Sequence, residues 1–422
     1  MPMLTIIADS NIAHLHDYFN AQTLQAEVNV IAMIGREITA DILAKYQPDA
    51  LLIRSVTPIN QALLVDNHSV KFVGSATIGT DHVDQAYLAS RGIVFANASG
   101  CSKHSVAQYV LTAILTLRPQ YLSKQNPSLN AQQSPSPSIP TTPIIGIIGL
   151  GNIGSTLAKY AQDLGWQVLG YDPLLPPSDI NNASLDKVLM DSDAVSLHVP
   201  LTFPTTATNE QSPYPTYHLI NGKTLAKMPT DSLLINSARG QVVSESNLLA
   251  DIANTGRTVV LDVFEHEPMV SEQLLSSLAI ATPHIAGYTL EGKLRGTQMI
   301  FDAFVQTLPL TPSLEGRGKY LGEKDEQDNS LPLGGRAREG ENLFNQLLPP
   351  NPYHWQDLKN KLKSQSQEPL KSSPKKLAEF YDIMADDKLL RNAVDKQAGQ
   401  VNGDNFDKLR KNYLLRREWL FD

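Results

Sequence analysis

Three polar residues in the second half of the chain could together bind a carboxylate and move a proton. Arg239, Glu267 and His284 each follow a short apolar run that is typical of a buried strand. A guanidinium offers two parallel donors to a carboxylate, and histidine is the usual group for transferring a proton near neutral pH. A carboxylate beside that histidine favours its charged form and fixes the ring. Taken singly, such an arginine is usually a surface ion pair and such a histidine a structural residue, so their meaning depends on what precedes them.

A glycine-rich string that is typical of a dinucleotide-binding turn precedes them. The G-x-G-x-x-G spacing alone is a weak signal, but here an apolar run at 144–148 leads into it and a helical pattern leaves it. In such a turn the three glycines allow the bend, the approach of a pyrophosphate and the packing of the helix, and the helix N-terminus attracts phosphate. The residues assigned to this turn are Gly149, Gly151, Asn152, Ile153 and Gly154.

Asp172 indicates which dinucleotide binds. It ends the next predicted strand, 167–171, and lies 18 residues after Gly154. An acidic residue at this place accepts hydrogen bonds from the ribose hydroxyls of the adenosine and repels a 2′-phosphate. We therefore expect NAD, not NADP, as the cofactor. The alternative is a structural glycine turn followed by a chance aspartate.

Two series of alternating strand-like and helical patterns must position these residues. The alternation is typical of a parallel sheet with helices on both faces, whose ligands bind at the carboxyl ends of the strands. The first series has predicted strands at 4–8, 50–53, 71–74 and 93–95 and helices at 41–45, 83–90 and 105–117. The second has strands at 144–148, 167–171, 194–198, 232–236, 258–262 and 279–282 and then a long helix at 290–308.

Two stretches of low complexity interrupt these series. Residues 123–143 are rich in Ser, Pro, Gln and Asn, and residues 309–341 form a second biased stretch. Such segments cannot bury enough apolar surface to offset their ordering entropy, so we predict an insertion and a linker outside any core. The remaining residues, 342–422, are charged and have helical patterns.

The composition excludes several classes of protein. The 422 residues carry a formal net charge of −8, whereas a nucleic-acid-binding protein presents a basic face. Cys101 is the only cysteine, which excludes an intrachain disulfide and a multi-cysteine metal site; His82 and His104 lack ligand spacing, so we expect no metal. No apolar stretch approaches the ~18 residues of a membrane span. We expect a protein of the cytoplasm with neither a nucleic acid nor a membrane as partner.

Four motifs together resemble those of the D-isomer-specific 2-hydroxyacid dehydrogenases. Besides the glycine turn with Asp172, they are Asn-x-x-Arg-Gly at Arg239, Asp-x-x-x-x-Glu-Pro from Asp262 and Pro-His-x-Ala-Gly at His284. The resemblance implies an α/β fold of two Rossmann-like, doubly wound lobes, with the active site between them, and a small C-terminal dimerisation module. The implied parts are a split substrate domain (1–118 with 286–308), an NAD-binding domain (143–285) and the dimerisation module (342–422), with 123–143 and 309–341 outside them.

The resemblance also implies roles for the three residues considered first. Arg239 would hold the substrate carboxylate. His284 would take the hydroxyl proton while hydride leaves the same carbon for the nicotinamide, and Glu267 would orient His284. General acid–base catalysis of this kind raises the reaction rate about 10²–10⁴-fold.

Further roles follow from the same resemblance for the cofactor and the substrate. Asp262 would reach the nicotinamide end of NAD, and the backbone near Val199 and Gly287 would line the dinucleotide. The positions that match substrate contacts are Ser55, Thr77 and Tyr288.

Additional strings resemble the members of this family that act on a phosphorylated four-carbon acid. They occupy residues 53–57, 71–84, 98–101, 282–292 and 406–413. The implied reaction is the NAD-dependent oxidation of 4-phospho-D-erythronate to 2-oxo-3-hydroxy-4-phosphobutanoate, on the bacterial route to pyridoxal 5′-phosphate. The implied assembly is a homodimer.

Two basic regions could bind the substrate phosphate. Arg54, next to Ser55, either contacts the phosphate or merely ends a strand in solvent. The tail 408–417 carries five basic residues; either they form a solvated helix face, or one of them, such as Arg410, crosses a dimer interface to the phosphate.

Two other functions stay open from the sequence. One is the same chemistry on another D-2-hydroxy acid, such as 3-phosphoglycerate, although the tail shows no alternating strands of a regulatory domain. The other is a non-catalytic NAD-sensing protein, which the intact set of Arg239, Glu267 and His284 disfavours.

Overall fold

The structure is a computed structural model, and it describes residues 3–121, 142–204, 212–307, 343–364 and 377–420. Residues 123–141 and the whole of the predicted linker 309–341 lie outside the described residues. The chain divides into two compact units. Unit 1 comprises Met1–Ser102 and Leu290–Pro350, and unit 2 comprises Lys103–Thr289 and Asn351–Asp422.

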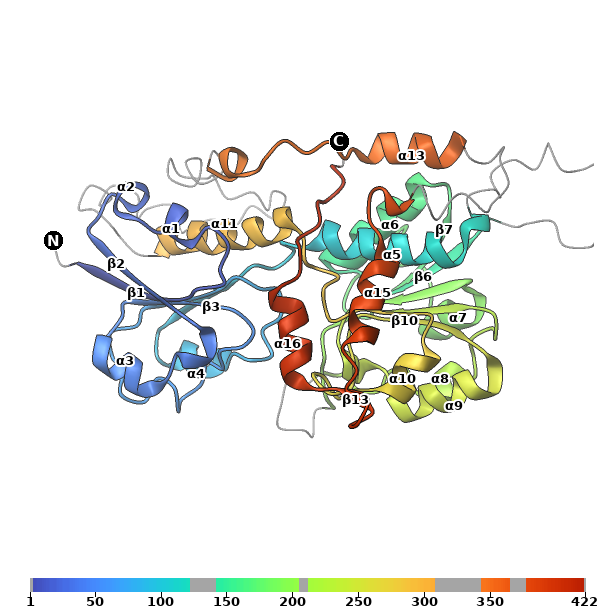
Figure 1. The fold of residues 1–422 in the computed structure, drawn as a ribbon, viewed down its shortest axis with the longest axis horizontal. Coiled ribbons are helices and arrows are strands. Elements are labelled where there is room, and N and C mark those ends of the chain that lie inside the picture. The colour runs from blue at the N-terminus through green and yellow to red at the C-terminus, as the bar shows by residue number, and fades with distance from the viewer. Residues whose placement is uncertain (1–2, 122–141, 205–211, 308–342, 365–376, 421–422) are drawn as a thin grey trace, which may run out of the picture. The chain divides into compact units, whose positions relative to one another are not determined.

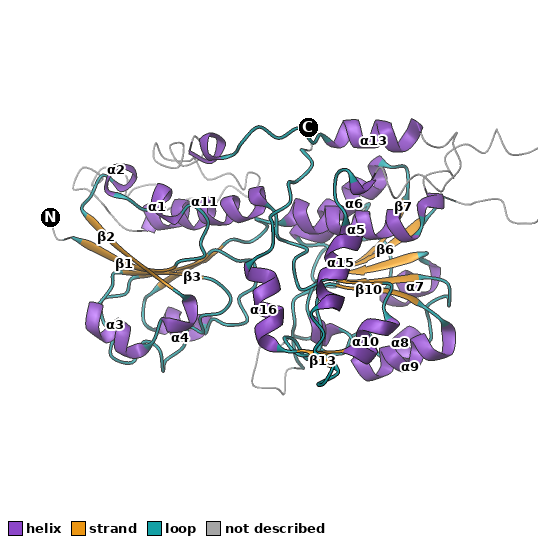
Figure 2. Cartoon of the chain, in the orientation of Figure 1, coloured by secondary structure: helices purple, strands orange, loops and turns teal. Residues whose placement is uncertain are grey.

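Unit 1 is built on a five-stranded parallel sheet with helices on both faces (Figures 1 and 2). The strand order is β2-β1-β3-β4-β5, with β1 (Leu4–Asp9), β2 (Val28–Met33), β3 (Ala50–Ile53), β4 (Phe72–Ser75) and β5 (Val94–Asn97). One face packs against α1 (Leu15–Tyr18) and α11 (Leu290–Thr307), and the other against α3 (Ala40–Tyr46) and α4 (Gln85–Ser90). Side chains alternate between these two clusters along each strand: Ile6 and Leu52 join the first, and Ile7 and Leu51 the second.

Unit 2 holds a six-stranded parallel sheet of order β12-β10-β9-β8-β6-β7. Its strands are β6 (Ile144–Ile148), β7 (Gln167–Tyr171), β8 (Ala194–Leu197), β9 (Leu233–Asn236), β10 (Thr258–Leu261) and β12 (Ile280–Ala281). One face is covered by α5 (Lys103–Leu117) and α6 (Asn152–Asp163), and the other by α7 (Leu185–Asp191), α8 (Gly222–Leu225), α9 (Glu245–Thr255) and α10 (Glu272–Ser277). The predicted pair of doubly wound α/β sheets is confirmed, and each predicted strand lies within two residues of its expected bounds.

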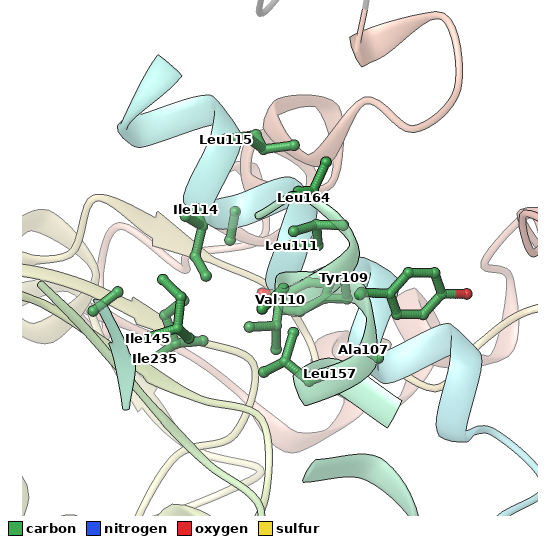
Figure 3. Close-up of a cluster of buried hydrophobic side chains, with 14 of the residues drawn as sticks. Ala107, Tyr109, Val110, Leu111, Ile114, Leu115, Ile145, Leu157, Leu164 and Ile235 are labelled. Atoms are coloured by element: carbon green, nitrogen blue, oxygen red, sulfur yellow. The ribbon is translucent and has the colours of Figure 1, made fainter. Parts of the chain in front are cut away.

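The division of the chain differs from the expected one at α5. We expected residues 1–118 in the first lobe, whereas α5 belongs to unit 2. Its residues from Ser105 to Leu115 are all buried, which requires packing on every side of the helix. Figure 3 shows Leu111 and Ile114 of α5 among Leu157 of α6 and Ile145 of the sheet.

The C-terminal segment also packs within unit 2, where we expected a separate module. It contains α13 (Trp355–Ser364), α15 (Ile383–Asn392), β13 (Gln400–Val401) and α16 (Gly403–Lys411). Trp355 and Trp419 join the cluster around α5 and α6, while Phe406 joins the cluster on the opposite face of the sheet. β13 pairs antiparallel with β11 (Val270–Ser271), so this segment shares hydrogen bonds with the dinucleotide-binding part of the chain.

Candidate active site

The predicted glycine turn lies between β6 and α6. Gly149 has φ +90°, a conformation that favours glycine, and a Cβ there would meet the carbonyl oxygen of His198 at 2.6 Å. A Cβ on Gly154 would lie 1.9 Å from the carbonyl oxygen of Gly149, so the helix can pack here only without a side chain. A Cβ on Gly151 would meet nothing within 4 Å. Two of these glycines are therefore required by the protein itself, and the third leaves open space beside the backbone.

The start of α6 is suited to an anion. The helix has 12 residues, and its N-cap residue, Gly151, has no side chain to bind the first-turn N–H groups. Helix N-termini of this kind attract phosphate through these N–H groups and the helix dipole. The structure thus fits the pyrophosphate of a dinucleotide at this turn, and Asn152 and Ile153 lie in the first turn of the helix.

Asp172 follows β7 and lies beside the same turn. Its Oδ2 accepts a hydrogen bond from the backbone N–H of Leu150 at 3.0 Å, and its Oδ1 accepts one from Leu174 at 3.0 Å. The carboxylate is therefore oriented by the backbone and only half-buried. Val199, two residues after β8, lies against the turn, because a Cβ on Gly149 would be 2.8 Å from the Cγ1 of Val199.

His284 and Glu267 form a hydrogen-bonded pair at the carboxyl end of the sheet. His284 Nδ1 lies 2.8 Å from Glu267 Oε1, and the two side chains are 34% and 20% exposed. Burial alone would raise the pKa of Glu267, but the charges of His284 and Arg410 and the hydrogen bond from His284 outweigh burial and lower it. Glu267 is thus an ionised acceptor, which holds the proton of His284 on Nδ1 and leaves Nε2 to the reacting group.

The backbone of His284 is held in an unusual conformation. Its φ is 55°, in the left-handed region that non-glycine residues rarely adopt. The N–H of His284 donates to the carbonyl oxygens of Asp262, at 2.8 Å, and Thr282, at 2.9 Å. Such strain costs about 1–3 kcal/mol and persists only where surrounding contacts impose it.

Asp262 is one source of those contacts. Its side chain is buried and accepts hydrogen bonds from Thr282 Oγ1 at 2.6 Å and from the backbone N–H groups of Ile285 at 2.8 Å and Ala286 at 2.9 Å. Burial raises the pKa of Asp262 against the opposing effects of His284 and these hydrogen bonds. The carboxylate therefore fixes the loop that carries His284, a function the sequence did not indicate. Its predicted contact with the nicotinamide stays a prediction.

Arg239 lies on a turn that packs against the segment carrying Glu267. Asn236, fully buried at the end of β9, donates through Nδ2 to the carbonyl oxygen of Arg239 at 2.8 Å. Arg239 itself donates from Nη1 to the carbonyl oxygen of Ala238 at 2.8 Å and is half-buried. A Cβ on Gly240 would lie 1.9 Å from the carbonyl oxygen of Phe264, so the Arg-Gly pair permits this close approach.

The predicted substrate contacts of unit 1 lie at the carboxyl ends of two adjacent strands. Ser55 is exposed two residues after β3, next to the half-buried Arg54. Thr77 follows β4, and its Oγ1 lies 2.9 Å from Ser75 Oγ. Because β3 and β4 are neighbours in the sheet, the structure brings Ser55 and Thr77 to the same edge of unit 1.

Two arginines of the tail contact the segments that carry Glu267 and His284, whereas the sequence suggested a solvated face or a phosphate contact. Arg410 of α16 lies 3.9 Å from Glu267 of the same chain, where we had considered a phosphate across a dimer interface. Arg416 donates to the backbone carbonyl oxygens of Ile285 and Ala286 in the loop after His284. The idea of a solvated basic face holds for the exposed Lys408 and Lys411, but not for these two arginines.

Tyr288 and Gly287 complete the same loop. The guanidinium of Arg410 lies over the ring of Tyr288, with its Cζ 5.8 Å from the ring centroid. The ring centroids of Tyr288 and Tyr413 are 6.2 Å apart. Gly287 is half-buried two residues after Ile285. Within unit 2 the structure therefore groups Glu267, His284 and Tyr288, all predicted from the sequence, around a tail arginine.

The described residues contain neither a candidate metal site nor a candidate membrane span. Across the described ranges, no group of three or more His, Cys, Asp and Glu side chains could hold a metal ion. No helix in the part of the chain that the structure describes is long and apolar enough to cross a membrane.

Comparison with known families matches two parts of the chain. Residues 123–286 match the family model described as "D-isomer specific 2-hydroxyacid dehydrogenase, NAD binding domain", and residues 347–420 match "Domain of unknown function (DUF3410)". The chain is 58% identical over 421 residues to the erythronate-4-phosphate dehydrogenase of Psychrobacter sp. (strain PRwf-1), with 100% of both chains covered. It is 42% identical over 416 residues to the enzyme of that name from Acinetobacter baylyi, covering 99% of this chain and 98% of the relative.

Solved structures share the fold at lower identity. A glyoxylate reductase from Paecilomyes thermophila matches with a TM-score of 0.57 at 22% identity, over 72% of this chain and 95% of that chain. The holo form of D-mandelate dehydrogenase from Rhodotorula graminis matches with a TM-score of 0.56 at 24% identity, over 71% and 93%. At such identities the likeness concerns the fold.

Proposed function

The chain belongs to the erythronate-4-phosphate dehydrogenases of the D-isomer-specific 2-hydroxyacid dehydrogenase family, and we propose that it oxidises 4-phospho-D-erythronate with NAD. The product is 2-oxo-3-hydroxy-4-phosphobutanoate, on the route to pyridoxal 5′-phosphate. The observation that carries the proposal is the His284–Glu267 pair, held at 2.8 Å on a strand-end loop in the unit that also carries the dinucleotide turn.

NAD fits the residues around the glycine turn. The open space beside Gly151 and the uncapped start of α6 suit the pyrophosphate, and Asp172 would hold the adenosine ribose. Asp262 would reach the nicotinamide end, and the backbone near Val199 and Gly287 would line the dinucleotide. When bound, NAD accepts the hydride that leaves C2 of the substrate.

The geometry of the His284–Glu267 pair indicates which group takes the proton of the substrate hydroxyl. Glu267, kept ionised, can only accept a hydrogen bond, so His284 donates from Nδ1 and offers the lone pair of Nε2. His284 takes the proton of the C2 hydroxyl as the C–H bond to that carbon breaks and the carbonyl forms. In the reverse direction the same nitrogen returns the proton.

The remaining residues bind the substrate. Arg239 would bind the C1 carboxylate through its planar guanidinium and polarise the reacting oxygen. In the structure its Nη1 donates a hydrogen bond to the carbonyl oxygen of Ala238 at 2.8 Å. Ser55, Thr77 and Tyr288 would contact the remainder of the phosphorylated acid.

We also propose a homodimer in the cytoplasm. The groove between α15 and residues 408–416 is lined by apolar and charged residues together, and Leu389 and Leu414 on it are 48% and 90% exposed. Large exposed apolar side chains next to a groove are typical of an interface, and a second copy of the chain would cover them. The single cysteine suits a reducing compartment.

A substrate panel tests the proposed reaction. NADH formation is measured with 4-phospho-D-erythronate, 3-phosphoglycerate and D-lactate in parallel. We expect kcat/KM for 4-phospho-D-erythronate to exceed that for D-lactate by at least about 10²-fold, because an acid without a phosphate leaves the polar groups of a phosphate site unpaired. It should also exceed the value for 3-phosphoglycerate, whose phosphate lies one carbon nearer the carboxylate. Preference for 3-phosphoglycerate would reassign the substrate, and NADH binding without turnover of any acid would favour the NAD-sensing alternative.

A further inference from the structure

Arg410, in the last turn of α16, lies against the proton-transfer pair of its own chain. Its Nη1 is 3.9 Å from Glu267 Oε1, and its guanidinium lies over the ring of Tyr288. The side chain is only 19% exposed, and its Nε is a buried donor with no hydrogen-bond partner. A cation so poorly hydrated needs a compensating charge, and the carboxylate of Glu267, 3.9 Å away, supplies one.

The packing of α16 makes this contact a fixed one. Asn402 caps the helix by accepting a hydrogen bond from the N–H of Asn405 at 2.8 Å. Phe406 is fully buried, and its ring meets that of Phe264, three residues before Glu267, edge to face at 6.2 Å. Val401 pairs with Val270, three residues after Glu267. The segment that carries Glu267 is thus bound to the tail on both sides.

We propose that Arg410 is a positioning residue for catalysis, which holds the Glu267 carboxylate in place and ionised so that Glu267 can orient His284. The inference rests on the proposed function. Through Arg410, the C-terminal segment that matches a domain of unknown function (residues 347–420) would contribute directly to the reaction.

The charged groups around the pair determine the direction of the effect. Glu267 faces His284 from the loop after β12 and Arg410 from α16, while Arg410 also faces Tyr288 and, on its own helix, Asp407. Burial raises the pKa of Glu267, and the interactions with His284 and Arg410 outweigh burial. Removing the charge of Arg410 takes away one of them, so Glu267 would become protonated at a higher pH and would then no longer accept the proton of His284 Nδ1.

This role differs from a phosphate contact in what it predicts for kinetics. An arginine that binds the phosphate changes KM for the phosphorylated substrate, whereas one that acts through Glu267 changes kcat and the acid limb of the pH profile. We expect Arg410→Gln to lower kcat about 10-fold or more and leave KM for 4-phospho-D-erythronate within about 3-fold. A large rise in KM with kcat unchanged would overturn the proposal and favour the phosphate contact.

The decisive experiment is a titration that needs no substrate. The full chain is labelled with 13C at the glutamate carboxyl carbons, and the resonance of Glu267 is identified by its loss in Glu267→Gln. We expect the titration midpoint of Glu267 to rise by about 1 pH unit or more in Arg410→Gln, as loss of a charge at this distance implies. It should stay near the wild-type value in Arg410→Lys and in Lys411→Gln, which removes an exposed charge from the same helix.

Two outcomes would overturn the inference. One is an unmoved Glu267 midpoint in Arg410→Gln. The other is failure of both Arg410→Gln and Arg410→Met to fold, judged by thermal unfolding, while Arg410→Lys folds; this would assign Arg410 a structural role. The titration does not depend on turnover. A wild-type enzyme without activity would therefore contradict the proposed function, while the titration would still test the role of Arg410.

Discussion

At the scale of single residues, the two carboxylates near His284 accept hydrogen bonds from different donors. Glu267 takes the Nδ1 proton of His284, and Asp262 takes the N–H groups that follow His284 in the chain. The two carboxylates differ in environment: interactions with His284 and Arg410 outweigh burial and lower the pKa of Glu267, while burial raises that of Asp262. The sequence predicted the residue types because their chemistry requires them. It could not predict that Asp262 fixes the loop, because that depends on backbone N–H groups that carry no sequence signal.

The charge of Asp172 should determine the choice of dinucleotide. In Asp172→Asn we expect KM for NAD to rise about 10-fold and the preference for NAD over NADP to fall, because the repulsion of a 2′-phosphate is lost. Steady-state kinetics with both cofactors measure this. Asp179→Asn, which removes an exposed charge from the same loop, should change neither value. An unchanged cofactor preference in Asp172→Asn would contradict the role given to this residue.

At the scale of elements, strands with a continuous apolar run were predictable, whereas the edge strand β2 was not. β6 is an apolar run whose last four residues are fully covered, so its sequence alone indicates a strand. β2 lies at the edge of its sheet and is partly exposed along its length, and no strand was predicted there. α5 was predicted as a helix. Its assignment to unit 2 depends on its packing against α6 and the second sheet, which the sequence of α5 does not indicate.

Two glycines of the dinucleotide turn provide a matched pair of variants. Gly154→Ala should destabilise the protein by about 1–3 kcal/mol, because its Cβ would overlap the Gly149 carbonyl oxygen at 1.9 Å. Gly151→Ala should leave the thermal unfolding temperature near the wild-type value, because nothing lies within 4 Å of its Cβ. We nevertheless expect Gly151→Ala to weaken NADH binding about 10-fold or more, since the pyrophosphate needs that space. Wild-type NADH affinity in Gly151→Ala would show that the pyrophosphate does not pass there.

At the scale of the whole molecule, the tail is the part least predictable from sequence. Its basic residues suggested either a solvated face or a phosphate site, and its local pattern could not show that Arg410 and Arg416 face inward. Arg416 donates to carbonyl oxygens 285 and 286, more than a hundred positions earlier in the chain. Long-range contacts of this kind appear only once the segment is packed. The motifs at 282–292 and 406–413, noted separately in the sequence, meet in the structure where Arg410 and Tyr413 contact the ring of Tyr288.

The groove that carries the exposed Leu389 and Leu414 should be part of the dimer interface. In Leu414→Glu we expect sedimentation velocity to show a shift from dimer to monomer at low micromolar concentration, because burying a carboxylate at an apolar contact is costly. Val65→Glu is the matched control, since Val65 is 52% exposed on unit 1 and should not affect assembly. A wild-type chain that is monomeric, or a Leu414→Glu variant that remains dimeric, would contradict this assignment.

The central claim is that hydride leaves C2 of the substrate for NAD while His284 takes the hydroxyl proton. The most direct test mixes the NAD-loaded enzyme with 4-phospho-D-erythronate deuterated at C2 and follows NADH formation and the position of the label. We predict that deuterium appears on the nicotinamide ring, and that His284→Ala lowers the rate by about 10²–10⁴ with little change in NADH affinity. Deuterium released to water, or a His284→Ala rate near that of the wild type, would contradict the account.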